Sequence, residues 1–251
     1  MGLPRYRLGI DFKDEGFLAY GAVRVAEGQV PHRDFISIQP PLSFYTAALM
    51  FKLFGTSLVS LRILGLCIYM LIPLLIYAIS RNMTTRVLSL TAALPATILG
   101  IPFFNFVPFA VWQGIVTALA AVFFYMRATT DGQRNWAFLA GLTTAATILL
   151  RHDQGFYLVI AILAYSIALN FVKYDVDAKP ALKPILGLWT AGIGAFMLPA
   201  GIYWFMCGAL PAMIKQLVIF PVTAYAKTSS LPFPVFSSDI PFVQNTIVGL
   251  F

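Results

Sequence analysis

The chain has 251 residues, of which 59% are hydrophobic and only 11% are charged. Soluble domains of this size carry about 25% charged residues, so the composition excludes a soluble protein and requires lipid to cover most of the surface. The net charge is +7, but the basic residues lie singly between apolar runs. This is typical of membrane-protein loops and excludes a nucleic-acid partner.

Residues 1–57 are predicted to form an outer segment with two short helices at the membrane surface. Over Asp14–Gln29, Leu18, Ala22 and Val25 share one helical stripe, which indicates an amphipathic helix. Asp14 stands where an N-cap residue is expected. After the Pro40–Pro41 break, Leu42–Phe54 is too short to span a membrane and is predicted to form a second interfacial helix.

Residues 58–207 contain six apolar runs of about the length of a membrane-spanning helix. They are Leu58–Ser80, Val87–Phe104, Val107–Met126, Trp136–Leu150, Gly155–Val172 and Ile185–Cys207. No ionisable residue lies at the apolar centre of the runs between Ser80 and Cys207. The predicted fold is therefore an all-α, polytopic transmembrane bundle, and residues 208–251 begin another outer segment.

Lysines and arginines in the short loops predict the orientation of the bundle. Alternate loops hold seven of them, namely Arg81, Arg86, Arg127, Arg134, Lys173, Lys179 and Lys183, whereas the intervening loops hold only Arg151. The seven predict a cytoplasmic face. Residues 1–57 would then lie outside despite their own basic residues, which predicts a preceding membrane helix. A new apolar run at Gly249–Phe251 predicts that the C-terminal part is missing as well.

A series of short motifs runs through the first outer segment. In chain order they are Asp14–Glu15–Gly16, Glu27–Gly28 with Pro31, Asp34–Phe35, Pro40–Pro41–Leu42, Phe54–Gly55 and Arg62. Their order and spacing resemble the first outer loop of the GT-C glycosyltransferases. The nearest resemblance is to the bacterial family related to protein mannosyltransferases and aminoarabinose lipid A transferases. It is good over Asp11–Arg62 and moderate through Asp153.

The resemblance implies an inverting glycosyltransferase in a bacterial inner membrane. Such enzymes pass a sugar from a polyprenyl phosphate to a lipid, glycan or protein acceptor on the extracytoplasmic face. This chemistry needs a carboxylate to take the acceptor's proton and a cation at the departing phosphate. By its position in the family's acidic pair, Asp14 is the expected base, with capping of its helix as the alternative. Glu15 is expected to orient Asp14 or a loop partner.

A second cluster is Arg151–His152–Asp153, on a predicted outer loop. Three ionisable residues at a membrane boundary are costly unless they are solvated or paired. We expect Arg151 to hold the donor phosphate, Asp153 to face the acceptor or a metal ion, and His152 to line the substrate site. The alternative is an interfacial loop in which Arg151 only reaches lipid headgroups.

The remaining candidates lie in or just after the first segment. Arg33 and Asp34 are expected to bind substrate, and Gln39 stands where some relatives carry a phosphate-binding lysine. Arg62 is expected either to reach the donor phosphate or to anchor its helix. His32, His152 and a carboxylate suggest a divalent metal ion as an optional cofactor, but no tight ligand spacing supports one, so no metal ligand is assigned.

Two other interpretations stay open. The first is a transporter or flippase, against which the absence of charges near the membrane midplane counts. The second is an inactive fragment of a glycosyltransferase, because both ends of the enzyme are predicted to be missing.

Overall fold

The computed structural model describes residues 14–103, 106–131, 133–171 and 182–225. The helices are α1 (Asp14–Ala26), α2 (Leu42–Phe54), α3 (Leu58–Arg81), α4 (Arg86–Phe103), α5 (Ala110–Thr130), α6 (Asn135–Leu150), α7 (His152–Phe171), α8 (Leu182–Met206) and α9 (Leu210–Ile214). The last continues as π-helical turns over Lys215–Ile219 and Pro221–Tyr225. These ranges contain no strand, which confirms the all-α prediction.

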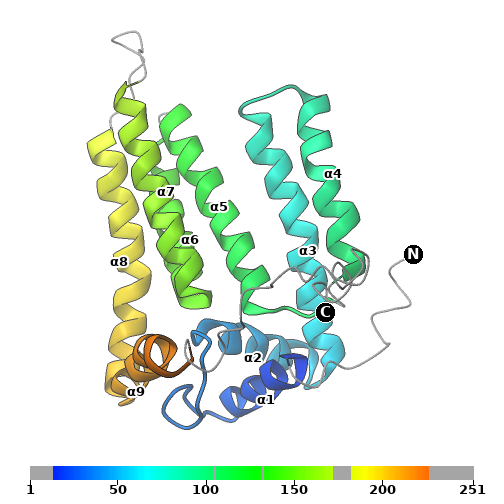
Figure 1. Ribbon diagram of the computed structural model, residues 1–251, viewed down its shortest axis with the longest axis vertical. Coiled ribbons are helices and arrows are strands. Elements are labelled where there is room, and N and C mark those ends of the chain that lie inside the picture. The colour runs from blue at the N-terminus through cyan, green and yellow to red at the C-terminus, as the bar shows by residue number, and fades with distance from the viewer. Residues whose placement is uncertain (1–13, 104–105, 132, 172–181, 226–251) are drawn as a thin grey trace, which may run out of the picture.

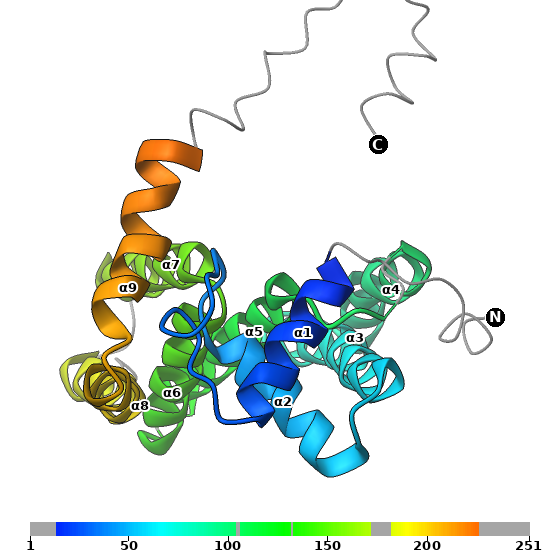
Figure 2. The same ribbon diagram turned by 90° about the horizontal axis from the view of Figure 1, so that it is seen from below.

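Helices α3 to α8 run alternately up and down, and α1 and α2 lie across one end of them (Figure 1). We call this the α1–α2 end. It also holds the α4–α5, α6–α7 and α8–α9 junctions, as Figure 2 shows from below. The predicted outer and cytoplasmic loops thus lie at opposite ends of the bundle. Which end faces the cytoplasm remains a prediction.

Within the part of the chain that the structure describes, four helices are long and apolar enough to cross a membrane: Leu58–Arg81, Ala110–Thr130, His152–Leu169 and Leu182–Met206. The apolar parts of the other two, Arg86–Ile98 and Asn135–Leu150, are shorter. Large apolar side chains such as Leu74, Val87 and Phe205 are exposed along the bundle. Exposed apolar surface on this scale fits a protein whose bundle is surrounded by lipid.

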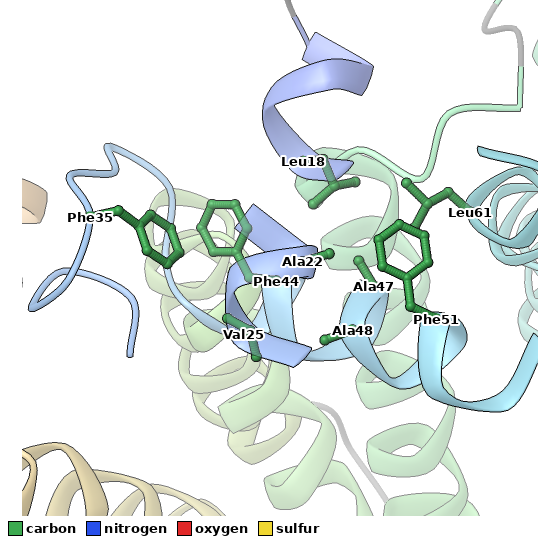
Figure 3. Packing of buried hydrophobic residues seen from close by; sticks show 9 residues of the cluster. All are labelled: Leu18, Ala22, Val25, Phe35, Phe44, Ala47, Ala48, Phe51 and Leu61. Atoms are coloured by element: carbon green, nitrogen blue, oxygen red, sulfur yellow. The ribbon is translucent and has the colours of Figure 1, made fainter. Parts of the chain in front are cut away.

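Helices α1 and α2 pack against each other as a separate layer (Figure 3). The predicted stripe of Leu18, Ala22 and Val25 is buried, and it meets Phe44 and Ala47 of α2. The stripe thus packs on protein, not on the lipid surface as the sequence had suggested. On α2, Leu49 and Leu53 are exposed, so this helix is the better candidate for contact with lipid.

Helices α6 and α8 approach closely where two glycines face each other. A Cβ atom on Gly141 would lie 2.1 Å from the carbonyl oxygen of Trp189, and one on Gly192 would lie 2.2 Å from that of Phe138. Small residues allow such close packing between membrane helices. Nearby, the indole of Trp189 donates a 3.1 Å hydrogen bond to Thr144.

We expect Gly141→Ala to destabilise the bundle by about 1–3 kcal/mol, because the added methyl group meets backbone and forces α6 and α8 apart. Thermal unfolding of the purified protein in detergent measures the loss. Gly187→Ala in α8 is the matched control, since nothing lies within 4 Å of its added Cβ. Equal stability of the two variants would contradict the close approach.

Candidate functional site

Among the described residues, the α1–α2 end gathers three arginine–carboxylate pairs. They are Glu15–Arg62, Arg33–Asp34 and Arg151–Asp153. All six residues were among the candidates from the sequence. The pairs differ in exposure: the first is buried, whereas the other two are partly open to solvent. The buried pair is therefore suited to holding the fold together, whereas the two open pairs are accessible to a ligand.

The buried pair joins α1 to α3. Arg62 donates from Nε and Nη2 to the two carboxylate oxygens of Glu15, at 2.8 and 2.9 Å. Glu15 is fully buried and Arg62 is 5% exposed. An arginine bound in this two-point geometry is held in a fixed orientation. Glu15 thus orients Arg62 of the next helix, and in this structure Arg62 is not open to a donor phosphate.

Asp14 is the first residue of α1, directly before Glu15. Its side chain lies outside what the structure describes, but its backbone position is set by the helix that Glu15 pins to α3. The helix N-terminus favours a negative charge. The start of α1 is therefore a firmly placed position for an ionised carboxylate.

Arg151 lies at the turn between α6 and α7. Its backbone N–H donates to Thr147 at 2.7 Å, and its guanidinium donates to both oxygens of Asp153, at 2.9 and 2.6 Å. The side chains of Arg151 and Asp153 are 33% and 43% exposed. His152, the first residue of α7, is exposed. Arg151 therefore keeps a solvent-facing cation at the end of the bundle.

The turn between α6 and α7 fits against α5 at a glycine. A Cβ on Gly114 would lie 2.1 Å from Oε1 of Gln154 and 3.4 Å from Cβ of Arg151. The hydroxyl of Thr46 on α2 donates to Gln113 of α5 at 2.7 Å. These contacts seat the second cluster and α2 on the same end of α5.

The loop between α1 and α2 is ordered around Asp34. This carboxylate accepts from Arg33 at 2.8 Å and from the Val30 N–H at 2.7 Å. The hydrogen bond from Arg33, followed by that from the Val30 N–H, is the largest cause that lowers the pKa of Asp34 to about 2. Arg24 donates to the Asp34 carbonyl at 2.9 Å and stacks on the Phe35 ring. Asp34 is thus held ionised.

Arg33 also reaches the end of α8, where it donates to the Cys207 carbonyl at 3.2 Å. At the other end of the loop, Gln39 is half-buried and its backbone N–H donates to the Ser37 hydroxyl. The three substrate-binding candidates of this loop therefore lie on one ordered turn that contacts α8.

Gln216, which no sequence pattern singled out, binds the same loop. Its Oε1 lies 2.9 Å from Nδ1 of His32 and accepts from the Ser37 N–H at 3.0 Å, while its Nε2 donates to the His32 carbonyl at 3.1 Å. The only feature of the sequence that could have drawn attention to Gln216 is that it is a polar residue within an apolar run. Its partners lie more than 170 residues away, so the sequence could not pair them.

The pKa of His32 lies below its ordinary value of 6.5, because burial lowers it by more than the hydrogen bonds with Gln216 and the Gln39 backbone raise it. The folded protein thus holds the imidazole neutral. Unfolded chains bind a proton at His32 as the pH falls through 6.5, whereas the folded state does so only at lower pH. The stabilisation is therefore complete above pH 6.5 and is lost as the pH falls through the folded-state pKa.

We expect His32→Asn to flatten the dependence of the thermal midpoint on pH between about pH 5.5 and 7.5. Asparagine tolerates the left-handed backbone of this position, where φ is 68°. All other ionisable residues are the same in both proteins, so the difference between their slopes isolates His32. Identical slopes would contradict a neutral, buried imidazole.

The structure adds no support for a metal site. Within the described ranges, no three His, Cys, Asp or Glu side chains are grouped as metal ligands. His32 uses Nδ1 for Gln216, and His152 is exposed on another segment. The pairing of these two histidines around a divalent ion remains a hypothesis from the sequence.

Comparison with known proteins gives one match. The model of the dolichyl-phosphate-mannose-protein mannosyltransferase family matches residues 38–204, which is more than half of the chain. No curated protein and no solved structure matched. The matched residues include α2 to α7 and most of α8, with Gln39, Arg62 and the Arg151–Asp153 cluster. This all-α membrane protein belongs to the dolichyl-phosphate-mannose-protein mannosyltransferase family, a family of glycosyltransferases.

Proposed function

We propose that the protein transfers a sugar from a polyprenyl phosphate to a lipid, glycan or protein acceptor at the extracytoplasmic face of a bacterial inner membrane. The observation that carries the proposal is the gathering of the candidate acids and cations at the α1–α2 end of a bundle of this family. A lipid-linked donor has its phosphate at the membrane surface, and these charges lie at one end of the apolar bundle.

In the proposed reaction, Asp14 takes the proton of the acceptor hydroxyl as that oxygen attacks the anomeric carbon. The new carbon–oxygen bond forms on the face opposite the phosphate, and the old bond breaks with its electron pair going to the phosphate oxygen. The configuration at the anomeric carbon is therefore inverted. A base that takes up the proton in this way typically contributes about 10²–10⁴-fold to the rate.

The departing phosphate needs positive charge, and Arg151 is our candidate to supply it. A guanidinium matches the oxygens of a phosphate with two parallel hydrogen bonds. Asp153 holds Arg151 in place through the same geometry until the donor binds. Arg33 is a second candidate cation, because it is 43% exposed while Asp34 fixes its direction.

The test is transfer of labelled sugar by membranes that contain the protein. We expect transfer from polyprenyl-phosphate mannose, the first donor to try because the family name contains mannose, and none from the nucleotide sugar alone. Membranes without the protein are the control. Failure with mannose and with other polyprenyl-phosphate sugars in membranes that contain the folded protein would reject the proposed function.

A further inference from the structure

The side chain of Gln216 makes three hydrogen bonds to the loop between α1 and α2. Two go to His32 and one to Ser37. Figure 2 shows this loop beside the orange helix that begins with α9. We call Gln216, His32 and Ser37 the loop clamp. It joins segments that are far apart in the chain.

The hydrogen bonds fix the direction of every donor in the clamp. The Ser37 N–H can only donate, so the Gln216 atom that it meets is the carbonyl oxygen Oε1. The Gln216 amide nitrogen then donates to the His32 carbonyl. Because Oε1 only accepts, Nδ1 of His32 carries the ring proton. The clamp therefore selects one tautomer of a histidine that is 2% exposed.

The clamp acts on a strained turn. His32 has φ of 68°, in the left-handed region that residues with a Cβ rarely adopt. Such residues persist only where their surroundings hold them. Here the His32 N–H donates to Phe35, and Gln216 binds both the ring and the carbonyl of His32.

The hydrogen bonds of Gln216 add to an apolar contact between the loop and the start of α9. Val30 of the loop is buried with Trp204 and Ala209, and Met213 of α9 packs against this cluster. Neither α9 nor the turn Lys215–Ile219 has a buried side chain, and Val218 and Ile219 are about half-exposed. The loop itself exposes Ile36 and Ile38. Without the clamp, the loop keeps the Val30 contact and the Arg33–Cys207 hydrogen bond. Its turn at His32 and Ser37 loses the hydrogen bonds to Gln216 and should open more often.

We propose that Gln216 is a positioning residue for the donor: it keeps the loop in the shape that presents Arg33 and Gln39 to the lipid phosphate. The proposal rests on the proposed function. Gln216 acts through the loop rather than on the reacting atoms. Its loss should therefore weaken donor binding and leave the chemical step of bound donor intact.

The test compares three variants in the transfer assay. Gln216→Met keeps the size but no hydrogen bond, and we expect it to raise the KM for the lipid donor about tenfold with kcat within about twofold of wild type. Gln216→Glu keeps the two hydrogen bonds that Gln216 accepts, and its KM should lie between those of the wild type and Gln216→Met. Gln133→Met is the matched control, since Gln133 binds Trp136 at the opposite end of the bundle.

Hydrogen exchange of the loop gives a readout that does not need activity. Exchange of the peptide that contains the Ser37 N–H should be faster in Gln216→Met and unchanged in Gln133→Met. An unchanged KM in Gln216→Met, or a loss confined to kcat, would overturn the positioning role. In that case, transfer by the wild type would still support the proposed function. Absence of transfer by the wild type rejects the enzyme and the donor role together, and unchanged exchange rejects the clamp itself.

Discussion

Glu15→Ala is expected to lower the free energy of unfolding by about 3–5 kcal/mol, because it leaves the guanidinium of Arg62 charged and buried without its carboxylate. Both side chains lie in the contact between α1 and α3, and both guanidinium–carboxylate hydrogen bonds are lost. Thermal or denaturant unfolding of the detergent-solubilised protein measures the effect.

Asp131→Ala is the control for this variant. It removes the exposed pair of Arg127 and Asp131, which lie four residues apart at the opposite end of the bundle. Exposed helical pairs of this spacing contribute only about 0.3–0.5 kcal/mol. A similar small loss in Glu15→Ala would show that water reaches Arg62, and that the pair does not pin α1.

The double variant Glu15→Ala, Arg62→Met separates the lost attraction to Glu15 from the cost of burying the Arg62 charge. Replacing both partners of a buried ion pair by apolar groups is often neutral or stabilising. We therefore expect the double variant to recover most of the stability lost in Glu15→Ala. Its sugar transfer should remain impaired if the pair is needed to set the position of α1 and hence of Asp14.

The helices were predictable because lipid imposes a simple rule on the sequence. A run such as Leu58–Ser80 can only be a helix when no water is present to bind its backbone, and α3 covers it as Leu58–Arg81. The stripe of Leu18, Ala22 and Val25 was also found correctly, but periodicity gives only the buried face. Whether lipid or α2 covers that face depends on packing that the pattern does not contain.

The pairing of charges was harder to predict than their gathering at one end. Loop charges had to lie outside the apolar core, so their common end followed from the alternation of the helices. That Glu15 binds Arg62 required the crossing geometry of α1 and α3, which one sequence does not reveal. Gln216 was missed for the same reason: its three hydrogen bonds depend on a turn at His32 with a left-handed backbone that no motif indicates.

Asp14→Asn is expected to reduce kcat for sugar transfer by about 10²–10⁴-fold, because an amide cannot take the proton of the acceptor hydroxyl. The competing interpretation is that Asp14 only caps α1. Asparagine and serine cap helices about as well as aspartate, so Asp14→Asn and Asp14→Ser remove the base and preserve any capping at this helix start. Loss of the negative charge at the helix N-terminus should cost no more than about 0.3–1 kcal/mol of stability.

The two interpretations therefore predict opposite results in the same experiment. If Asp14 is the base, both variants fold with nearly the wild-type thermal midpoint and both lose transfer. Retained transfer in both would leave Asp14 as a cap and move the search for the base to Asp153, the partly exposed carboxylate of the α6–α7 turn. Asp131→Asn, at the opposite end of the bundle, should keep full activity and shows that removing an acid elsewhere is harmless.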